Sequence, residues 1–281
     1  MVDDNRFRSL LVGIAADEEY AQDPGLNHAM DLARAYRSRL TVYVFAPALL
    51  QPFPLTLGSS SVWIAQETDR IEQLSGQTAQ TVRQLVSQAG IPVTVVHARS
   101  PFDGRYQRFI DLARLHDLTI LRAATSSGAG DRIAIEHALF DTGRSVLVTP
   151  QKNFAVSKRV AIGWDGSARA ARAVRDSLDF LIGADHVAIA TVIDTRGSQG
   201  LRSADGLALY LAQYGIETTL CVIANEQGDD EGHPLRQFVA KEQIELLVMG
   251  AFVHSRLRQA ILGGMTQSLL DECPIPIMMA Y

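Results

Sequence analysis

The sequence has little cysteine, no long apolar run and no excess of basic charge. Its 281 residues include two cysteines, too few for a disulfide framework, which predicts a reducing compartment. No apolar stretch approaches the ~18 residues of a membrane-spanning helix, and the acidic residues within Met1–Arg8 are unlike a secretory signal. The net charge of −5 gives no basic field for nucleic acid or an anionic membrane. We therefore expect a cytoplasmic protein without nucleic-acid or membrane partners.

Several catalytic and cofactor motifs are also absent from the sequence. It contains no P-loop, no Gly-x-Gly-x-x-Gly dinucleotide motif and no Gly-x-Ser-x-Gly nucleophile turn. The seven histidines are scattered and there is no Cys-x-x-Cys pair, so we expect no metal site. Cys221 and Cys273 lie in or beside apolar strands, which favours packing thiols over nucleophiles. We predict that the protein is not an enzyme, or at most a slow ATP hydrolase.

What the sequence does contain is a regular alternation of short apolar runs with amphipathic segments, which is typical of an α/β fold. The first half has five candidate strands, at Leu10–Ala15, Leu40–Phe45, Val93–His97, Leu118–Leu121 and Ser145–Val148. The second half has five in the same order, at Arg159–Trp164, His186–Ile193, Glu217–Val222, Leu246–Met249 and Ile275–Met279. This repeat predicts two tandem doubly wound domains, 1–152 and 153–281, each with a mostly parallel five-stranded sheet flanked by helices.

Local signals recur in both halves. Gly90 and Gly215 precede the third strand of each half, where a helix ends and a left-handed residue is needed. Asp23 and Ser167 are the expected N-caps of the first helices. The expected buried stripes of these helices are Leu26, Ala29, Met30 and Ala33 in the first half, and Ala171, Val174, Leu178 and Leu181 in the second. The segment Pro47–Trp63 is extra to the first half, and either a surface loop or a lid fits its composition.

Chemistry in such folds is expected just beyond the carboxyl ends of the strands. Asp165 follows the first strand of the second half and either binds a ribose or adenine edge or only caps the next helix. Gly250 follows the fourth strand, where the lack of a Cβ lets a ligand approach the backbone. Gly263 and Gly264 precede a helix whose free amides favour an anion, and Thr266 either donates to a phosphate or caps that helix.

At these positions the sequence resembles the universal stress protein family. The family's nucleotide signature is Gly, two residues, Gly, nine residues, then Gly followed by Ser or Thr, and Gly250 and Gly263 hold its first and third glycines. The turn Trp164–Ser167 and the run Cys273–Ile277 match the family's first loop and its Cys-Pro-x-Pro lead into the last strand. The resemblance implies a tandem member whose two domains pack as an intrachain pseudo-dimer. Whether two chains also form a homodimer is left open.

Two departures weaken the expected nucleotide site. Val253 replaces the second glycine of the signature, and Gly264 replaces its Ser or Thr hydroxyl. In the first half, Arg122 stands where the second half has Gly250, so we expect no site of this type there. The resemblance thus implies a stress-response regulatory protein that binds ATP in the second domain only; the alternative is a scaffold with a degenerate, empty site. The implied nucleotide contacts are Asp165, Val192, Gly250, Val253, His254, Gly263, Gly264, Met265 and Thr266.

Overall fold

The computed structural model describes residues 7–16, 23–47, 59–99, 106–124, 129–152, 157–193, 199–225, 230–251 and 262–281. Its first half comprises β1 (Ser9–Ala15), α1 (Pro24–Tyr36), β2 (Arg39–Phe45), α2 (Ser59–Gln88), β3 (Val93–His97), α3 (Gln107–Arg114), β4 (Leu118–Arg122), α4 (Ala129–Asp141) and β5 (Val146–Thr149). Its second half comprises β6 (Arg159–Gly163), α5 (Ala168–Asp176), α6 (Leu178–Ile182), β7 (His186–Ile193), α7 (Gln199–Ala212), β8 (Thr218–Ala224), α8 (His233–Lys241), β9 (Leu246–Gly250), α9 (Gly264–Asp271) and β10 (Ile277–Ala280).

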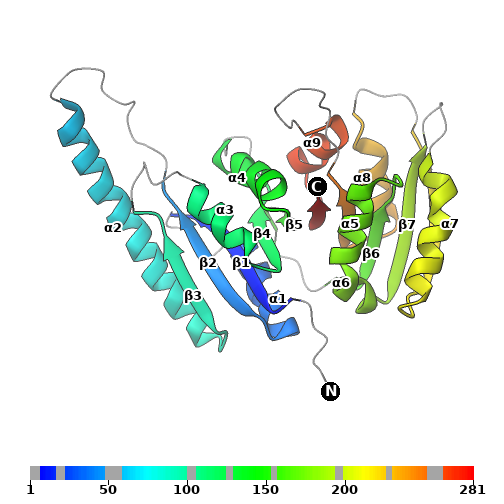
Figure 1. The fold of residues 1–281 in the computed structure, drawn as a ribbon, viewed down its shortest axis with the longest axis horizontal. Helices are drawn as coiled ribbons and strands as arrows, with labels where there is room; N and C mark the ends of the chain where they lie inside the picture. Colours follow the sequence, from blue (N-terminus) through cyan, green and yellow to red (C-terminus); the bar gives the residue numbers. More distant parts are fainter. Residues whose placement is uncertain are drawn as a thin grey trace.

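All ten strands join in one sheet with the order β3-β2-β1-β4-β5-β10-β9-β6-β7-β8 (Figure 1). Within each half every strand pairs in parallel with its neighbours. Among the described strands, the antiparallel pairing is the one between β5 and β10, and it joins the halves. The predicted fold class and the predicted strands are confirmed, with ends that shift by one or two residues; β10, for example, begins only after Pro276.

The junction between the halves has an internal two-fold pattern. Leu147 pairs with Met278, while Val146 pairs with Met279 and Val148 with Ile277. Adding 131 to a residue number of β5 gives its counterpart in β10. Leu147 pairs with its own counterpart, and Val146 and Val148 each pair with the counterpart of the other. All of these side chains are almost completely buried. The two last strands thus cover each other's edges, which removes two free sheet edges from solvent.

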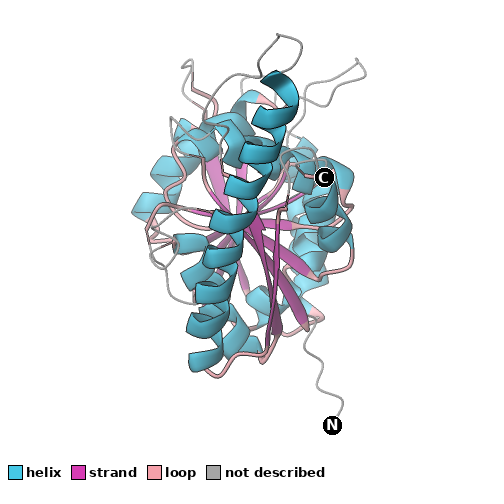
Figure 2. Cartoon of the chain, turned by 90° about the vertical axis from the view of Figure 1, so that its left-hand side faces the viewer, coloured by secondary structure: helices cyan, strands magenta, loops and turns pink. Residues whose placement is uncertain are grey.

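Helices cover both faces of the sheet, as Figures 1 and 2 show. Most buried apolar residues of α1, α2, α5, α6 and α7 belong to one apolar core and most of those of α3, α4, α8 and α9 to a second, while Ile71 of α2 packs in a small third cluster with Ala46 and Ala98. Each of the two larger cores contains side chains from both halves, so the apolar packing is continuous across their junction. The 30-residue helix α2 stands in front of the sheet in Figure 2, beside the edge strand β3. No helix in the described part of the chain is long and apolar enough to cross a membrane.

The predicted helix signals are confirmed with one correction. Asp23 accepts a hydrogen bond from the Leu26 amide (2.9 Å) and Ser167 from the Ala170 amide (3.1 Å), so both are N-caps. Gly90 and Gly215 both have φ of +74°. The stripe predicted for the second half is wrong at Ala171, which is exposed, because the buried face of α5 runs through Ala170, Ala173 and Val174.

The extra segment of the first half lies mostly outside the described residues. Residues 48–58 are not described, so the choice between a loop and a lid stays a prediction. Trp63, at the end of that segment, belongs to α2 and is partly buried. The predicted boundary between residues 152 and 153 also adjoins residues that are not described, 153–156.

Candidate nucleotide site

The candidate site of the second half lies at the carboxyl ends of β6, β7 and β9. β6 pairs with β9 on one side and β7 on the other, so the strand order reverses there and leaves a crevice in such sheets. Asp165 follows β6, Val192 lies near the end of β7 and Gly250 ends β9. Gly263 and Gly264 form the start of α9. Val253 and His254 lie outside the described residues.

Asp165 has a structural role and retains one available oxygen. Its Oδ1 accepts a hydrogen bond from the Ser167 amide (2.9 Å), which fixes the turn that leads into α5. Its Oδ2 has no hydrogen-bond partner among the described residues, and the residue is only partly buried. The capping interpretation of Asp165 is therefore correct for one oxygen, while the second oxygen can still accept a bond from a hydroxyl.

Gly250 is required by the packing of β9 against α5. A Cβ added at this glycine would lie 2.6 Å from the Ala170 nitrogen and 2.9 Å from the Cβ of Arg169. Such contacts involve the first turn of a helix, so the obstacle is backbone, which cannot move aside cheaply. The sequence predicted close approach of a ligand here, but in the structure the group that approaches is the helix itself.

The start of α9 already holds a carboxylate. The Met265 amide donates a hydrogen bond to Oε2 of Glu231 (3.0 Å). A Cβ added at Gly264 would lie 2.8 Å from the same oxygen, so the missing side chain at 264 makes room for this carboxylate. A helix N-terminus attracts negative charge through its free amides and its dipole. Glu231 therefore occupies the position at which the sequence predicted a phosphate.

A polar cluster fixes the segment that carries Glu231. The carboxylate of Asp230 accepts hydrogen bonds from the Ser268 hydroxyl of α9, from Arg236 of α8 and from the Gly232 amide. The bond from Ser268, followed by those from Arg236 and Gly232, lowers the pKa of Asp230 from 3.8 to about 2. Asp230 is thus ionised at neutral pH and ties the start of α8 to α9, which keeps Glu231 at the helix start.

The remaining predicted contacts differ in accessibility. Thr266 is completely buried, and α9 has no side-chain cap, so the structure gives Thr266 neither the capping role nor an exposed hydroxyl. Val192 and Met265 are partly buried. The described residues include no group of three or more histidine, cysteine or acidic side chains that could hold a metal ion.

The two cysteines are free thiols. Burial raises the pKa of the Cys273 thiol to about 12, and burial also raises the pKa of Cys221. A raised pKa keeps a thiol protonated, and the protonated form is a poor nucleophile. The packing role predicted for both cysteines agrees with these environments.

The corresponding place in the first half is filled by an arginine. Leu118 pairs with Leu10 in the register in which Leu246 pairs with Val160, so Arg122 corresponds to Gly250. The Arg122 guanidinium lies 3.5 Å from the carboxylate of Asp23, whose side chain is 4% exposed. An ion pair therefore stands at the carboxyl end of β4, where the second half has only a glycine.

The residue on the helix that covers this strand end also differs between the two halves. Counted from the N-caps Asp23 and Ser167, Gly25 of α1 corresponds to Arg169 of α5. A Cβ at Gly25 would lie 3.0 Å from Asp23 Oδ1 and 3.5 Å from the Arg122 nitrogen. Glycine and arginine thus exchange places between strand and helix, but only Gly250 is required by close packing of the two elements, since the tight contact at Gly25 is with its own N-cap Asp23. Sequence reasoning compared only the strands and missed this exchange.

Comparisons with known proteins identify relatives of both halves. Residues 157–280 match the model of the Universal stress protein family. A curated universal stress protein from Synechocystis sp. is 28% identical over 214 residues, which cover 70% of this chain and 69% of that protein. The crystal structure of a universal stress protein from Archaeoglobus fulgidus aligns with a TM-score of 0.67 at 15% identity, over 98% of both chains. A functionally unknown protein from Pseudomonas aeruginosa aligns with a TM-score of 0.59 at 15% identity, over 98% of this chain and 92% of that chain.

Proposed function

We propose that the chain is a member of the universal stress protein family, whose model matches residues 157–280, and that it is a stress-response regulator whose second half binds an adenine nucleotide. The observation that carries this proposal is the Met265 amide at the start of α9, which already binds a carboxylate oxygen of Glu231. A carboxylate and a phosphate present similar acceptor oxygens to backbone amides. The position therefore has the donor and the dipole that a phosphate group requires.

In this proposal each part of the site has a separate role. The α9 amides hold the phosphates once Glu231 moves away, and the second oxygen of Asp165 accepts a hydrogen bond from a ribose hydroxyl. Gly250 acts indirectly, because it lets α5 pack closely and so places the Asp165 turn. ATP is the expected nucleotide. The proposal is one of binding and regulation and contains no chemical step.

A nucleotide phosphate has to compete with the Glu231 carboxylate for the Met265 amide. Its carboxylate must leave the Met265 amide before a phosphate binds, and this exchange lowers the apparent affinity for a nucleotide. The neighbouring Asp230 is ionised and carries the same negative sign as an incoming anion, so it adds repulsion, which its ion pair with Arg236 reduces. We therefore propose a weak, regulated nucleotide site rather than a tight one.

The second candidate function is a scaffold whose site stays closed. It is favoured by the same contact, because an internal carboxylate satisfies the helix start without any ligand. The two candidates differ in what the purified protein retains and in what Glu231→Ala does. Mass spectrometry of a denatured sample detects a retained nucleotide, and calorimetry measures ATP affinity before and after the substitution. Retained nucleotide, or ATP binding that tightens in Glu231→Ala, supports the nucleotide site. Absence of ATP binding in both proteins supports the scaffold.

The proposal also includes an assembly and a location. We propose that residues 1–152 and 153–281 are two domains that form a dimer within one chain, which the pairing of β5 with β10 supports. Further pairing of two chains is tested by light scattering. Cytoplasmic localisation remains part of the proposal and is tested by cell fractionation.

A further inference from the structure

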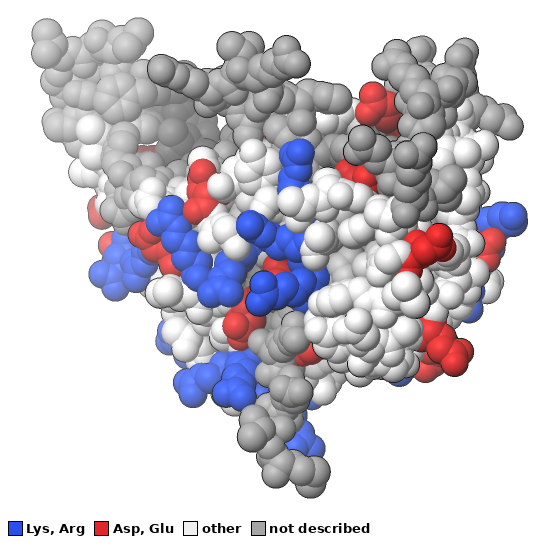
Figure 3. Space-filling view, turned by 45° about the vertical axis from the view of Figure 1, so that its right-hand side comes forward, with Lys and Arg blue, Asp and Glu red and all other residues white. Residues whose placement is uncertain are grey.

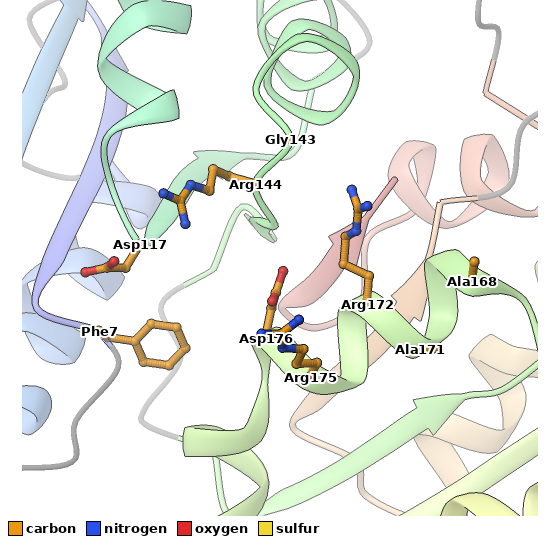
Figure 4. Close-up of a pocket in the computed structure, with 9 residues that line it drawn as sticks. All are labelled: Phe7, Asp117, Gly143, Arg144, Ala168, Ala171, Arg172, Arg175 and Asp176. Carbon is orange, nitrogen blue, oxygen red and sulfur yellow. The ribbon is translucent and has the colours of Figure 1, made fainter.

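A cleft between the two halves lies apart from the candidate nucleotide site. It has a volume of about 700 Å³, and its walls include Asp117 and Arg144 of the first half and Arg172, Arg175 and Asp176 of the second. Figure 4 shows Arg172, Arg175 and Asp176 on α5 at one side of this space and Arg144 and Asp117 at the other, with the Asp117 carboxylate turned toward β1 and the Arg144 guanidinium extended toward Asp117. The exposed alanines 168 and 171 on the outer face of α5 leave this space open. None of these residues belongs to the candidate nucleotide site.

The acidic side chains of the cleft are occupied by contacts within the protein. Oδ2 of Asp117 accepts hydrogen bonds from the Ser9 amide and hydroxyl, both at 2.8 Å. Oδ2 of Asp176 accepts one from the Ser145 hydroxyl (2.7 Å), which joins α5 to the start of β5. These bonds give both carboxylates structural roles at the walls and stabilise their positions.

The arginines retain donors that face the cleft. Arg144 donates from Nε to the main-chain oxygen of Arg114 (3.2 Å), and its two terminal amino groups have no acceptor among the described residues. Arg172 donates from Nη1 to the main-chain oxygen of Tyr281 (2.7 Å), and its Nε and Nη2 likewise have none in the described part of the chain. One bond thus anchors each guanidinium while its other N–H groups stay available. Basic side chains gather across the middle of the face shown in Figure 3.

The internal two-fold symmetry places an equivalent position between α1 and the start of β10, and that position lacks the two arginines. The shift of 131 residues that relates β5 to β10 carries Arg144 onto Ile275. Counted from the helix N-caps, Arg172 corresponds to His28 of α1, which is buried. The basic cleft is therefore specific to one side of the molecule and is not a by-product of the repeated fold.

We propose that this cleft binds a compact oligophosphate between Arg144 and Arg172, with Arg175 adding positive charge. Guanidinium groups bind phosphate oxygens in pairs of parallel hydrogen bonds, and two such groups from opposite walls suit a ligand with at least two phosphate groups. The volume falls within the range of roughly 300–1,000 Å³ that is typical of small-molecule sites. Because the arginines come from both halves, the bound anion connects them. This site does not depend on the proposed nucleotide site.

The test uses inorganic pyrophosphate as the probe and the full chain as the protein. Isothermal titration calorimetry at low salt measures pyrophosphate affinity for wild type, Arg144→Gln and Arg172→Gln. Each substitution removes a charge-assisted pair of bonds and is expected to weaken binding at least about tenfold. Arg34→Gln on the exposed surface of α1 removes the same charge outside the cleft and is expected to leave the affinity unchanged. Circular dichroism checks that the variants fold as wild type does.

Three results overturn the proposal. The first is the absence of pyrophosphate binding by the wild-type chain at low salt. The second is equal weakening in Arg34→Gln, which shows a general charge effect instead of a site. The third is a pyrophosphate affinity that changes in Glu231→Ala but not in the two cleft variants, which places the anion at α9. Selective weakening in Arg144→Gln and Arg172→Gln, with Glu231→Ala and Arg34→Gln unchanged, supports the cleft.

Discussion

The carboxyl ends of the strands are built differently in the two halves of the molecule. In the first half Arg122 extends from β4 to the N-cap Asp23, and α1 has glycine at position 25, where a Cβ would lie 3.0 Å from Asp23 Oδ1. In the second half Gly250 ends β9 against α5, whose corresponding residue is Arg169. The same two positions thus carry arginine and glycine in opposite order.

This difference shows that a strand and its neighbouring helix must be considered together. In the second half the strand residue has to be small because the helix backbone approaches it closely, whereas in the first half the strand carries a long side chain that reaches the helix N-cap. When the arginine is on the strand, its charge lies at the N-cap of α1 and fills the crevice with an ion pair. When the glycine is on the strand, the crevice is bounded by backbone, and a carboxylate from another loop, Glu231, binds at α9.

The largest effect is expected for Gly250→Arg, which places the first-half residue in the second half. Because a Cβ at 250 would lie 2.6 Å from the Ala170 nitrogen, the substitution should lower the free energy of unfolding by about 3 kcal/mol. Adding Arg169→Gly recreates the pair found in the first half and removes the 2.9 Å contact with the Arg169 Cβ but not the backbone contact with Ala170, so it should recover only a small part of this loss. Urea unfolding of the single and double variants measures both effects. Equal free energies of unfolding of the two variants would show that the residue at 169 does not affect the stability of an arginine at 250.

A smaller effect is expected in the first half for Arg122→Ala. The substitution leaves the carboxylate of Asp23 buried without the nearby guanidinium, and Arg122 is partly exposed, so the expected loss of stability is about 1–3 kcal/mol. The double variant with Asp23→Asn removes the charge as well, and it should lose less than the sum of the two single variants. Strict additivity in this cycle would contradict a coupled pair at this position.

The contact between Glu231 and α9 should change ATP affinity more modestly. Glu231→Ala removes the competing carboxylate, whose interaction with an exposed helix start is worth about 0.3–1 kcal/mol, so ATP should bind about two- to fivefold more tightly. Gly264→Ser puts a Cβ where the Glu231 carboxylate lies and should displace it, so the gain from Glu231→Ala should shrink in that background. Calorimetric titrations of the four proteins measure this coupling, and independent gains would argue against a shared position.

The smallest effect concerns the pH dependence of the Asp230 cluster. A carboxyl group whose pKa is lower in the folded state stabilises that state above its ordinary pKa of 3.8, and this contribution is lost as the pH falls toward about 2. Ser268→Ala removes the main cause of the low pKa, so the carboxyl of Asp230 should titrate at higher pH. NMR titration of this carboxyl in both proteins provides the measurement. An unchanged midpoint in Ser268→Ala would mean that the hydroxyl does not stabilise the charge.

Most of the fold could be predicted from local patterns. The apolar runs identified all ten strands, and the cap residues Asp23 and Ser167 marked the starts of α1 and α5, because these signals depend on near neighbours in the sequence. The stripe of α5 was misplaced at Ala171, because alanines stand at both 170 and 171 and only the packing of the helix decides which of them is buried. The two-fold pairing of Leu147 with Met278 could be expected only in outline, from two apolar last strands that needed cover.

The contents of the site were harder to predict. Gly250 and the start of α9 were identified from spacing, but Glu231 was missed because it bonds to Met265 across 34 residues, with no periodic pattern between them. Thr266 was proposed from its hydroxyl alone, whereas its burial depends on how α9 packs on the sheet. The role of Gly25 and Arg169 follows only when α1 and α5 are seen against the strands they cover.

The most direct test of the central claim is ATP binding by Gly250→Arg with Arg169→Gly, compared with wild type. The double variant gives the second half the strand and helix residues of the first, and its thermal unfolding confirms that it is folded. If the nucleotide site is in the second half, calorimetry should show ATP binding to wild type and none, or at least tenfold weaker binding, to the folded double variant. Equal ATP affinity of the two proteins would contradict the account.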